Sequence, residues 1–194
     1  MTATHLLYLH GFRSSPQSAK ARRMARWVAE QRPDLQWLCP QLPPSPRQAM
    51  GLINALLSDC PHGQLAVMGS SLGGFYASVV AQSRPDALTV LLNPAVDPAR
   101  DLARYIGEHS CWQKPEERFF FRAEYVDELS ALQPGEWRHP ERMMAVIAKG
   151  DEVLDWREMQ ARYARCRIKL LEGSDHGLSD FDDYLDELLT FLQL

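Results

Sequence analysis

The sequence lacks the features that mark several large classes of protein. No stretch approaches the roughly 20 consecutive apolar residues of a membrane-spanning helix, so we expect no membrane span. The first residues carry no basic segment before the first apolar run, and we expect no secretory signal. Basic residues form no stripe and acidic residues no block along the 194 residues, whose formal net charge is −4. A nucleic-acid partner and an acidic solvating tail are therefore not expected.

Cysteine is also scarce, and no two cysteines are paired in the sequence. The four are Cys39, Cys60, Cys111 and Cys166, widely spaced and without a Cys-x-x-Cys motif. We therefore expect neither a zinc site nor a disulfide framework, and no bound metal. Unpaired cysteines suit a reducing compartment, so the sequence favours a cytoplasmic location.

Short apolar runs alternate with amphipathic stretches over most of the chain. At 194 residues, 45% of them hydrophobic, the chain can bury one sizeable core. The alternation predicts a single α/β domain over residues 1–194, with about six mostly parallel strands and helices on both faces of the sheet. We expect strands at residues 5–10, 35–39, 64–68, 88–92, 143–148 and 167–171, and helices at 16–31, 46–60, 72–83, 155–165 and 180–192.

The segment from residue 95 to about 142 interrupts the alternation. It contains no clear strand, and helical spacing is visible only at 101–107 and 122–132. It is much longer than the usual connection of about 2–6 residues. We therefore expect this segment to form a small helical cap over the functional site, which in such sheets lies at the carboxyl ends of the strands. Its many aromatic residues either form the cap's own core or line an acyl pocket.

The third expected strand leads into Gly69-Ser70-Ser71-Leu72-Gly73-Gly74. A Gly-x-Ser-x-Gly motif between a strand and a helix is typical of the turn that exposes a nucleophilic serine. Ser71 is the candidate nucleophile, because Ser70 lacks a glycine two residues away on each side. A nucleotide-binding loop is not favoured, since the segment has neither Gly-x-Gly-x-x-Gly spacing nor a phosphate-binding lysine.

Two further strand ends carry the partners that such a serine needs. Asp151 follows the fifth expected strand and His176 follows the sixth, so the three residues occur in the order Ser, Asp, His. The carboxyl ends of parallel strands share one edge of a sheet, where these side chains can meet. His176 would take the serine proton, and an acid would orient the imidazole.

The identity of that acid is less certain from the sequence, because Asp151, Glu152 and Asp155 all follow the fifth strand. Asp151 is the first of the three and is preferred. Asp155 is better explained as the N-cap of the next helix. Asp175 adjoins His176, and the side chains of neighbouring residues diverge, which makes it a poor partner.

Backbone donors for a tetrahedral intermediate are also expected at this edge. The N–H of Leu72 lies at the start of a helix, and the N–H of Phe12 lies in the loop after the first strand. We interpret His10, which precedes that loop, as shaping it rather than as reacting directly.

Several segments together resemble a known family. They are Leu-Tyr-Leu-His-Gly-Phe at 7–12, Pro-Gln-Leu-Pro-Pro at 40–44, Gly-Ser-Ser-Leu-Gly-Gly at 69–74, Asn-Pro-Ala-Val at 93–96, Gly-Asp-Glu-Val-Leu-Asp at 150–155 and Asp-His-Gly at 175–177. The chain is similar in these to the YqiA-like esterases, which are small bacterial α/β-hydrolases. The resemblance implies a compact hydrolase fold, activity on short-chain acyl esters or acyl-CoA thioesters, and a triad of Ser71, Asp151 and His176. Gly177 departs from the expected small residue such as alanine.

The leading hypothesis is a serine carboxylesterase that works through an acyl-enzyme, with a small-molecule ester or thioester as substrate. No cofactor is implied, because a triad is chemically complete without one. A monomer is favoured. The alternative is a catalytically idle hydrolase fold that acts as a binding protein. The sequence does not set the acyl length or the leaving group.

Overall fold

A single sheet organises the molecule, and the computed structural model describes residues 3–194. Six strands lie in the order β2-β1-β3-β4-β7-β8, and every neighbouring pair is parallel. All six expected strands are confirmed to within two residues. They are β1 (His5–Leu9), β2 (Gln36–Leu38), β3 (Leu65–Ser70), β4 (Leu88–Leu92), β7 (Met143–Ala148) and β8 (Arg167–Leu171).

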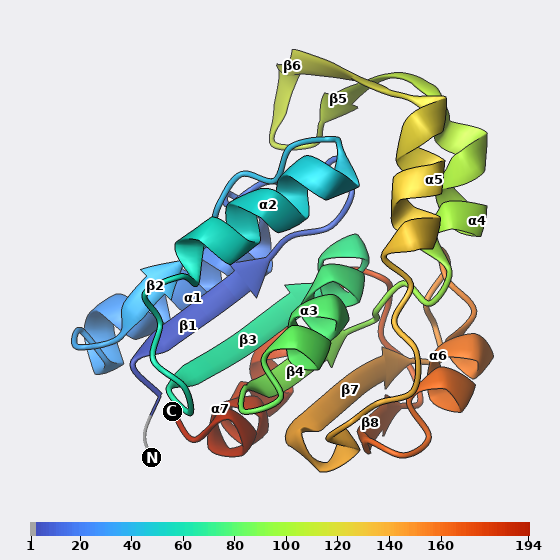
Figure 1. The fold of residues 1–194 in the computed structure, drawn as a ribbon. Helices are drawn as coiled ribbons and strands as arrows, with labels where there is room; N and C mark the ends of the chain where they lie inside the picture. The colour runs from blue at the N-terminus through green and yellow to red at the C-terminus, as the bar shows by residue number, and fades with distance from the viewer. Residues whose placement is uncertain (1–2) are drawn as a thin grey trace.

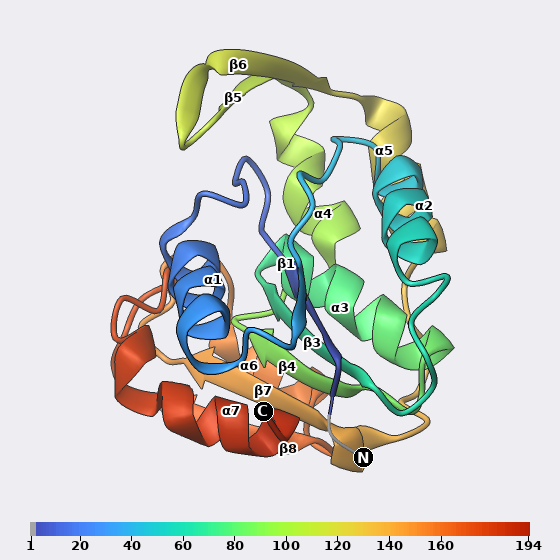
Figure 2. The same cartoon turned by 90° about the vertical axis from the view of Figure 1, so that its left-hand side faces the viewer.

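Helices cover both faces of the sheet, as expected (Figures 1 and 2). Side chains of α1 and α7 pack with Leu6 and Tyr8 of β1, whereas those of α2, α3 and α6 pack with Leu7 and Leu9. Because both faces are buried, the strands are apolar almost throughout instead of alternating. The helices are α1 (Ala19–Gln31), α2 (Pro46–Leu56), α3 (Leu72–Ser83), α6 (Trp156–Arg162) and α7 (Leu185–Leu192).

Two helix starts follow the sequence signals and one does not. The side chain of Asp155 caps α6, as expected, and α2 begins at residue 46, as expected, with Ser45 as its side-chain cap. The expected start of the first helix at residue 16 was wrong, because Ser18 is its N-cap. Ser15 instead donates a hydrogen bond to Gln113, 98 residues away, a contact that local sequence does not reveal.

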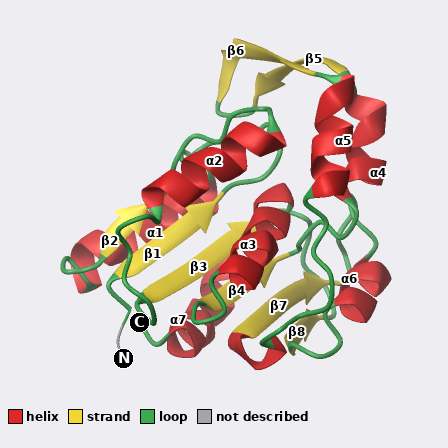
Figure 3. Ribbon diagram, viewed as in Figure 1, coloured by secondary structure: helices red, strands yellow, loops and turns green. Residues whose placement is uncertain are grey.

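The insertion between β4 and β7 contains strands, which corrects the expectation of a purely helical cap. An antiparallel hairpin, β5 (Gly107–Cys111) and β6 (Lys114–Phe121), stands beyond the carboxyl ends of the sheet (Figures 1 and 3). The sequence of β6 opens with Lys-Pro-Glu-Glu-Arg and lacks alternation, so it carries no strand signal. The rest of the insertion comprises α4 (Pro98–Leu102), η1 (Ala103–Tyr105), α5 (Ala123–Ala131) and η2 (Pro140–Arg142).

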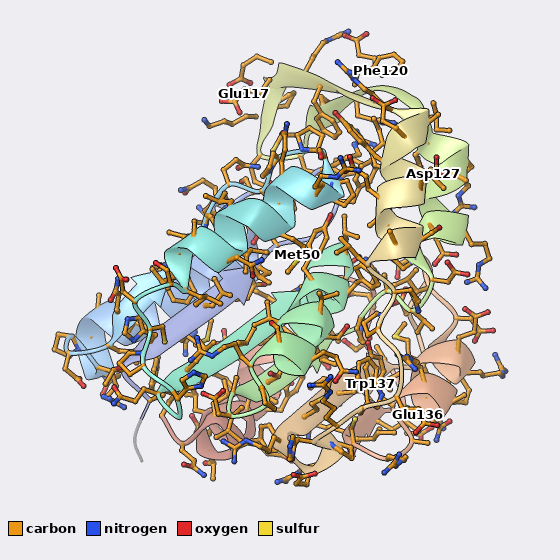
Figure 4. The ribbon with its side chains drawn as sticks, viewed as in Figure 1. Met50, Glu117, Phe120, Asp127, Glu136 and Trp137 are labelled. Atoms are coloured by element: carbon orange, nitrogen blue, oxygen red, sulfur yellow. The ribbon has the colours of Figure 1, made fainter. Side chains whose placement is uncertain are left out.

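The insertion packs its inner side chains onto the core of the sheet. Leu102, Phe121, Leu129 and Trp137 belong to the same apolar cluster as the α2–α3 face. Other side chains of β6 point outward, and Figure 4 shows Glu117 and Phe120 at the far edge of the hairpin. Phe120 is 56% exposed. The insertion is therefore anchored at its base and exposed along its outer strand.

Candidate active site

The site lies where the order of the strands changes direction. The chain passes from β1 to β2 on one side of β1 and returns to β3 on the other. In open α/β sheets, ligands bind at the carboxyl ends of strands beside such a switch point. Ser71 directly follows β3, and the loop of residues 10–15 follows β1, so both reach this crevice.

Ser71 sits on a strained turn that two glycines permit. Its φ of 56° and ψ of −121° are unusual for a residue with a side chain, and α3 begins at the next residue. A Cβ atom on Gly69 would come within 3.0 Å of the backbone of Gly73, and one on Gly73 would come equally close to the backbone of Leu9. The close packing of α3 on β1 and β3 therefore requires glycine at both positions.

The structure brings Ser71, His176 and Asp151 into one hydrogen-bonded chain. His176 Nε2 lies 3.0 Å from Ser71 Oγ, and His176 Nδ1 lies 2.8 Å from Asp151 Oδ2. An ionised carboxylate only accepts hydrogen bonds, which assigns the proton of the neutral imidazole to Nδ1. Nε2 is then free to accept the proton of Ser71.

Of the four acids near the imidazole, only Asp151 contacts it. The side chain of Asp151 is fully buried, and its other oxygen accepts two backbone N–H groups at 2.8 Å. Glu152 accepts the backbone N–H of His176, Asp155 caps α6, and Asp175 accepts the N–H of Ser179. The geometry thus places Asp151, the preferred acid, next to His176.

Asn93 is a site residue that the sequence reasoning did not single out. It is fully buried at the end of β4, with a φ of 41°. Its Nδ2 donates to the carbonyls of Asp175 and His176 at 3.0 and 3.3 Å, and its Oδ1 accepts the N–H of Ala148 at 2.8 Å. Asn93 therefore ties the loop that carries His176 to β4 and β7. A polar residue between a buried strand and Pro94 was the available signal.

His10 holds the loop after β1 and touches neither Ser71 nor His176. Its Nε2 accepts the N–H of Leu42 at 3.1 Å, so its Nδ1 carries the proton that is donated to the Gly11 carbonyl at 3.0 Å. Burial lowers the pKa of His10, although the bond to Gly11 opposes this. His10 is therefore neutral and links the loop to the proline-rich segment 40–44.

The two expected backbone donors lie beside Ser71. Within residues 3–194, the N–H of Phe12 makes no hydrogen bond to another backbone group. Leu72 is the first residue of α3, where an N–H has no partner inside the helix. Phe12, Leu72 and Ser71 line a common cavity, so both N–H groups are candidates to bind a negative oxygen.

Two cavities of about 230 Å³ each open onto Ser71 and His176. The first, here called the apolar cavity, has an apolar wall made by Ala95, Pro98, Leu102, Tyr105 and Leu154. The second, called the polar cavity, has a lysine and more hydroxyl groups in its lining than the first, beside Phe12 and Trp112. A third hollow of about 330 Å³ lies beyond Phe12 and includes neither Ser71 nor His176.

The aromatic residues of the insertion divide between a cluster around Phe12 and the lining of a cavity. The ring of Phe12 meets the rings of Phe119 and Phe121 edge-on, with centroids 5.8 and 5.3 Å apart. Tyr105 and Trp112 line the apolar cavity. The aromatics thus form a cluster around Phe12 and also a wall of the site.

The turn of the hairpin is fastened to the loop after β1. The N–H of Trp112 donates to the carbonyl of Arg13 at 2.8 Å, and Arg13 Nε donates to the carbonyl of Ser110 at 3.0 Å. The Arg13 guanidinium lies 4.0 Å from the centre of the Trp112 ring. The hairpin therefore holds the residue next to Phe12.

Residues 3–194 contain no cluster of three or more His, Cys, Asp or Glu side chains arranged to hold a metal ion. Across the same range, no helix has both the length and the apolar character to span a membrane. The four cysteines are free thiols.

Comparisons with known proteins agree with this architecture. The model of a family described as "Uncharacterised protein family (UPF0227)" matches residues 5–193. Est1E from Butyrivibrio proteoclasticus is similar in structure with a TM-score of 0.71 at 14% identity, over 98% of this chain and 87% of that one. Mouse alpha/beta hydrolase domain-containing protein 10 has a TM-score of 0.68 at 15% identity, over 95% and 90%. A protein of Agrobacterium vitis S4 proposed to be a hydrolase has a TM-score of 0.74 at 16% identity, over 99% and 91%. The chain has the α/β-hydrolase fold.

Proposed function

Because the chain belongs to the uncharacterised family UPF0227, the YqiA family, and has the α/β-hydrolase fold, we propose that it is a serine hydrolase of small carboxylic esters. The observation that carries this proposal is the hydrogen-bonded chain from Ser71 through His176 to Asp151. A serine hydroxyl is a weak nucleophile until a neutral imidazole takes its proton, and His176 is held 3.0 Å away to do so.

In the first half-reaction, Ser71 Oγ attacks the ester carbonyl while its proton passes to His176 Nε2. The imidazolium that forms is stabilised by the buried carboxylate of Asp151. His176 then returns the proton to the ester oxygen, the alcohol leaves, and the acyl group stays bonded to Ser71. A thioester can react by the same steps, with a thiol as the leaving group.

The negative oxygen of the tetrahedral intermediate needs fixed donors. Phe12 and Leu72 line a cavity together with Ser71, and within residues 3–194 the N–H of Phe12 donates to no other backbone group, which supports these two N–H groups as the donors. Removing one such donor typically costs about 3–4 kcal/mol of transition-state stabilisation. Their placement on a helix start and on a braced loop favours this role, because the donors need not rearrange during the reaction.

In the second half-reaction, a water molecule gives its proton to His176 and attacks the acyl group. The bond to Ser71 Oγ breaks, the serine regains a proton, and the carboxylic acid leaves. The apolar cavity of about 230 Å³ offers room for a short acyl chain against Leu102, Tyr105 and Leu154. This supports short-chain esters as substrates, in a protein that we take to be cytoplasmic and monomeric.

The proposal is tested by the hydrolysis of 4-nitrophenyl acetate and butyrate. The wild type should turn over both, Ser71→Ala should turn over neither, and Ser70→Ala is the matched control one residue away. A fluorophosphonate probe should label the wild type and the control at Ser71 and leave Ser71→Ala unlabelled. If a panel of esters and thioesters gives no turnover and the probe labels nothing, the protein is instead an idle hydrolase fold that binds a ligand.

A further inference from the structure

The polar cavity differs in character from its apolar neighbour. It shares Phe12, Ser71 and His176 with the apolar cavity, and it continues to Gly177 and the start of α1. Its wall includes the rings of Phe12 and Trp112 together with several hydroxyl groups and one ammonium group. The hydroxyl and ammonium groups belong to Tyr8, Ser14, Ser18, Ser70 and Lys20.

Lys20 is the only charged side chain other than the candidate base that lines this cavity. Its Nζ donates one hydrogen bond, to the carbonyl of Gly177, the residue that follows His176. An ammonium group has three N–H donors, so two remain for a ligand. Within residues 3–194, no carboxylate oxygen lies within 4.0 Å of Lys20 Nζ. Lys20 is therefore a cation next to the candidate triad with no carboxylate in direct contact, although Asp175 attracts it from beyond 4.0 Å.

A second polar group in the cavity is only weakly partnered. Ser18 Oγ has less than 1 Å² of accessible surface and no hydrogen-bond partner among the described residues within 3.5 Å. Burial raises the pKa of Tyr8 and the Ser18 hydroxyl lowers it, which puts the Tyr8 hydroxyl beside Ser18 as its nearest polar neighbour. Ser18 is the N-cap of α1, yet its side chain caps no N–H of the first turn. A buried hydroxyl without a partner is costly, and a ligand that accepts its proton would remove that cost. The positive end of the α1 dipole lies on the same side.

The nearest acids are occupied by other contacts. Glu152 accepts the backbone N–H of His176 at 2.9 Å, and Asp175 accepts the N–H of Ser179 at 3.0 Å. Neither residue lines the polar cavity. The unsatisfied donors at Ser18 and Lys20 thus favour an anionic oxygen there.

We propose that the polar cavity binds an anionic group, a carboxylate or a phosphate, on the alcohol half of the substrate, with Lys20 as the specificity-determining residue. This rests on the proposed function, because the alcohol half exists only if Ser71 takes an acyl group. The apolar cavity suits the acyl chain, which leaves the polar cavity for the leaving group. At about 30 Å³ per water molecule, 230 Å³ has room for about eight heavy atoms, so the anion must lie close to the ester.

The test compares esters that differ in the charge of one group. Acetoxyacetate carries a carboxylate on its alcohol half, acetoxyacetamide is its neutral counterpart, and 2-acetoxyethyl phosphate supplies the phosphate. Monomethyl succinate places the carboxylate on the acyl half instead. Each is assayed by product release with the wild type, Lys20→Met, Lys20→Arg and the control Lys169→Met, whose lysine pairs with Glu187 on α7.

The wild type should favour acetoxyacetate or the phosphate ester over acetoxyacetamide by at least about tenfold in kcat/KM, the effect of one charged hydrogen bond. Lys20→Met should lower kcat/KM on acetoxyacetate at least about tenfold more than on acetoxyacetamide, which abolishes that preference. Lys20→Arg should keep part of the preference, and Lys169→Met all of it.

Three results would overturn the inference. The first is no preference for an anion in the wild type, which needs no variant. The second is an equal loss of kcat/KM on charged and neutral esters in Lys20→Met, which would mean that Lys20 only stabilises the loop at Gly177. The third is a preference for monomethyl succinate, which would assign the cavity to the acyl half.

If the wild type hydrolyses 4-nitrophenyl acetate but does not discriminate by charge, the inference fails and the proposed function stands. If it hydrolyses no ester, both fail.

Discussion

The edge of the sheet and the insertion both surround Ser71, but they are built from very different sequence. The edge is made where buried apolar strands end in glycines and a few polar residues, and its geometry depends on backbone packing. The insertion is largely exposed along β6, and its hairpin is held by contacts with the loop after β1. The edge therefore supplies the reacting groups in rigid positions. The insertion lines the cavity beside them and holds the loop after β1.

The largest expected effect concerns the reacting groups at the edge. Ser71→Ala and His176→Gln should each lower kcat on 4-nitrophenyl acetate by at least about 10⁴-fold, because proton transfer and attack depend on both groups. The double variant should be no slower than either single one, which steady-state kinetics with enough enzyme can measure. If the double variant were slower by the product of the two single effects, Ser71 and His176 would act independently and not as one unit.

The next effect concerns the packing that exposes Ser71. Gly73→Ala should destabilise the fold by more than about 3 kcal/mol, because its Cβ would collide with the backbone of Leu9. The matched control is Gly51→Ala in α2, where nothing lies within 4 Å of the new Cβ. That control should gain about 0.5–1 kcal/mol from helix propensity.

Urea unfolding of the two glycine variants, followed by circular dichroism, measures both changes. Equal stability of the two would show that α3 can move away from β1 without cost, and the edge would then be less rigid than the contacts indicate.

A smaller effect is expected where the insertion braces the loop after β1. Arg13→Met removes the hydrogen bond to Ser110 and the guanidinium over Trp112. The neighbouring N–H of Phe12 should then lose its fixed position, and kcat should fall by about 10- to 100-fold, part of the cost of a lost oxyanion donor. Arg118→Met is the control, because Arg118 pairs with Glu108 on the exposed part of the hairpin.

Stability should hardly change in either arginine variant. If Arg13→Met retains full kcat, the hairpin only lines the cavity and does not hold the loop after β1 in position for catalysis. If Arg118→Met loses as much activity as Arg13→Met, the whole hairpin acts on the loop, and not the Arg13 contact in particular.

How far the sequence predicted these two regions follows from their physics. The six strands and the turn at Ser71 were predictable, since apolar runs and the Gly-x-Ser-x-Gly spacing are local signals. Asp155 was recognised as a helix cap because capping is also local. The hairpin was missed although its two strands are neighbours in the chain, because β6 opens with charged residues and a proline and neither strand alternates apolar and polar residues. The link between Ser15 and Gln113, which holds the turn of the hairpin, joins residues far apart in the chain.

The acid of the candidate triad was only partly predictable from the sequence. Several acids follow β7, and only the direction of the Asp151 side chain, fixed by two backbone N–H groups, separates it from Glu152. Asn93 was overlooked for a similar reason, because its partners at residues 148, 175 and 176 meet only in the folded sheet.

The smallest expected effect is a pH dependence of the preference for an anionic ester. Burial lowers the pKa of Lys20 to about 8, partly opposed by Asp175. Lys20 is then charged below pH 8 and neutral well above it, so the preference for an anionic ester should be constant up to about pH 7 and fall severalfold between pH 8 and 9.5.

The ratio of kcat/KM for acetoxyacetate and acetoxyacetamide measures this, because any pH effect that is common to the two esters cancels in the ratio. Other groups around the cavity do not titrate in this range: burial raises the pKa of Tyr8 far above it, a hydrogen bond from Ser179 lowers the pKa of Asp175 below its usual value, and burial keeps His10 neutral. In Lys20→Arg the ratio should not vary with pH, because arginine stays protonated throughout. A fall with pH in that variant would assign the titration to a group outside the cavity, and the anion preference of the edge would then not come from Lys20.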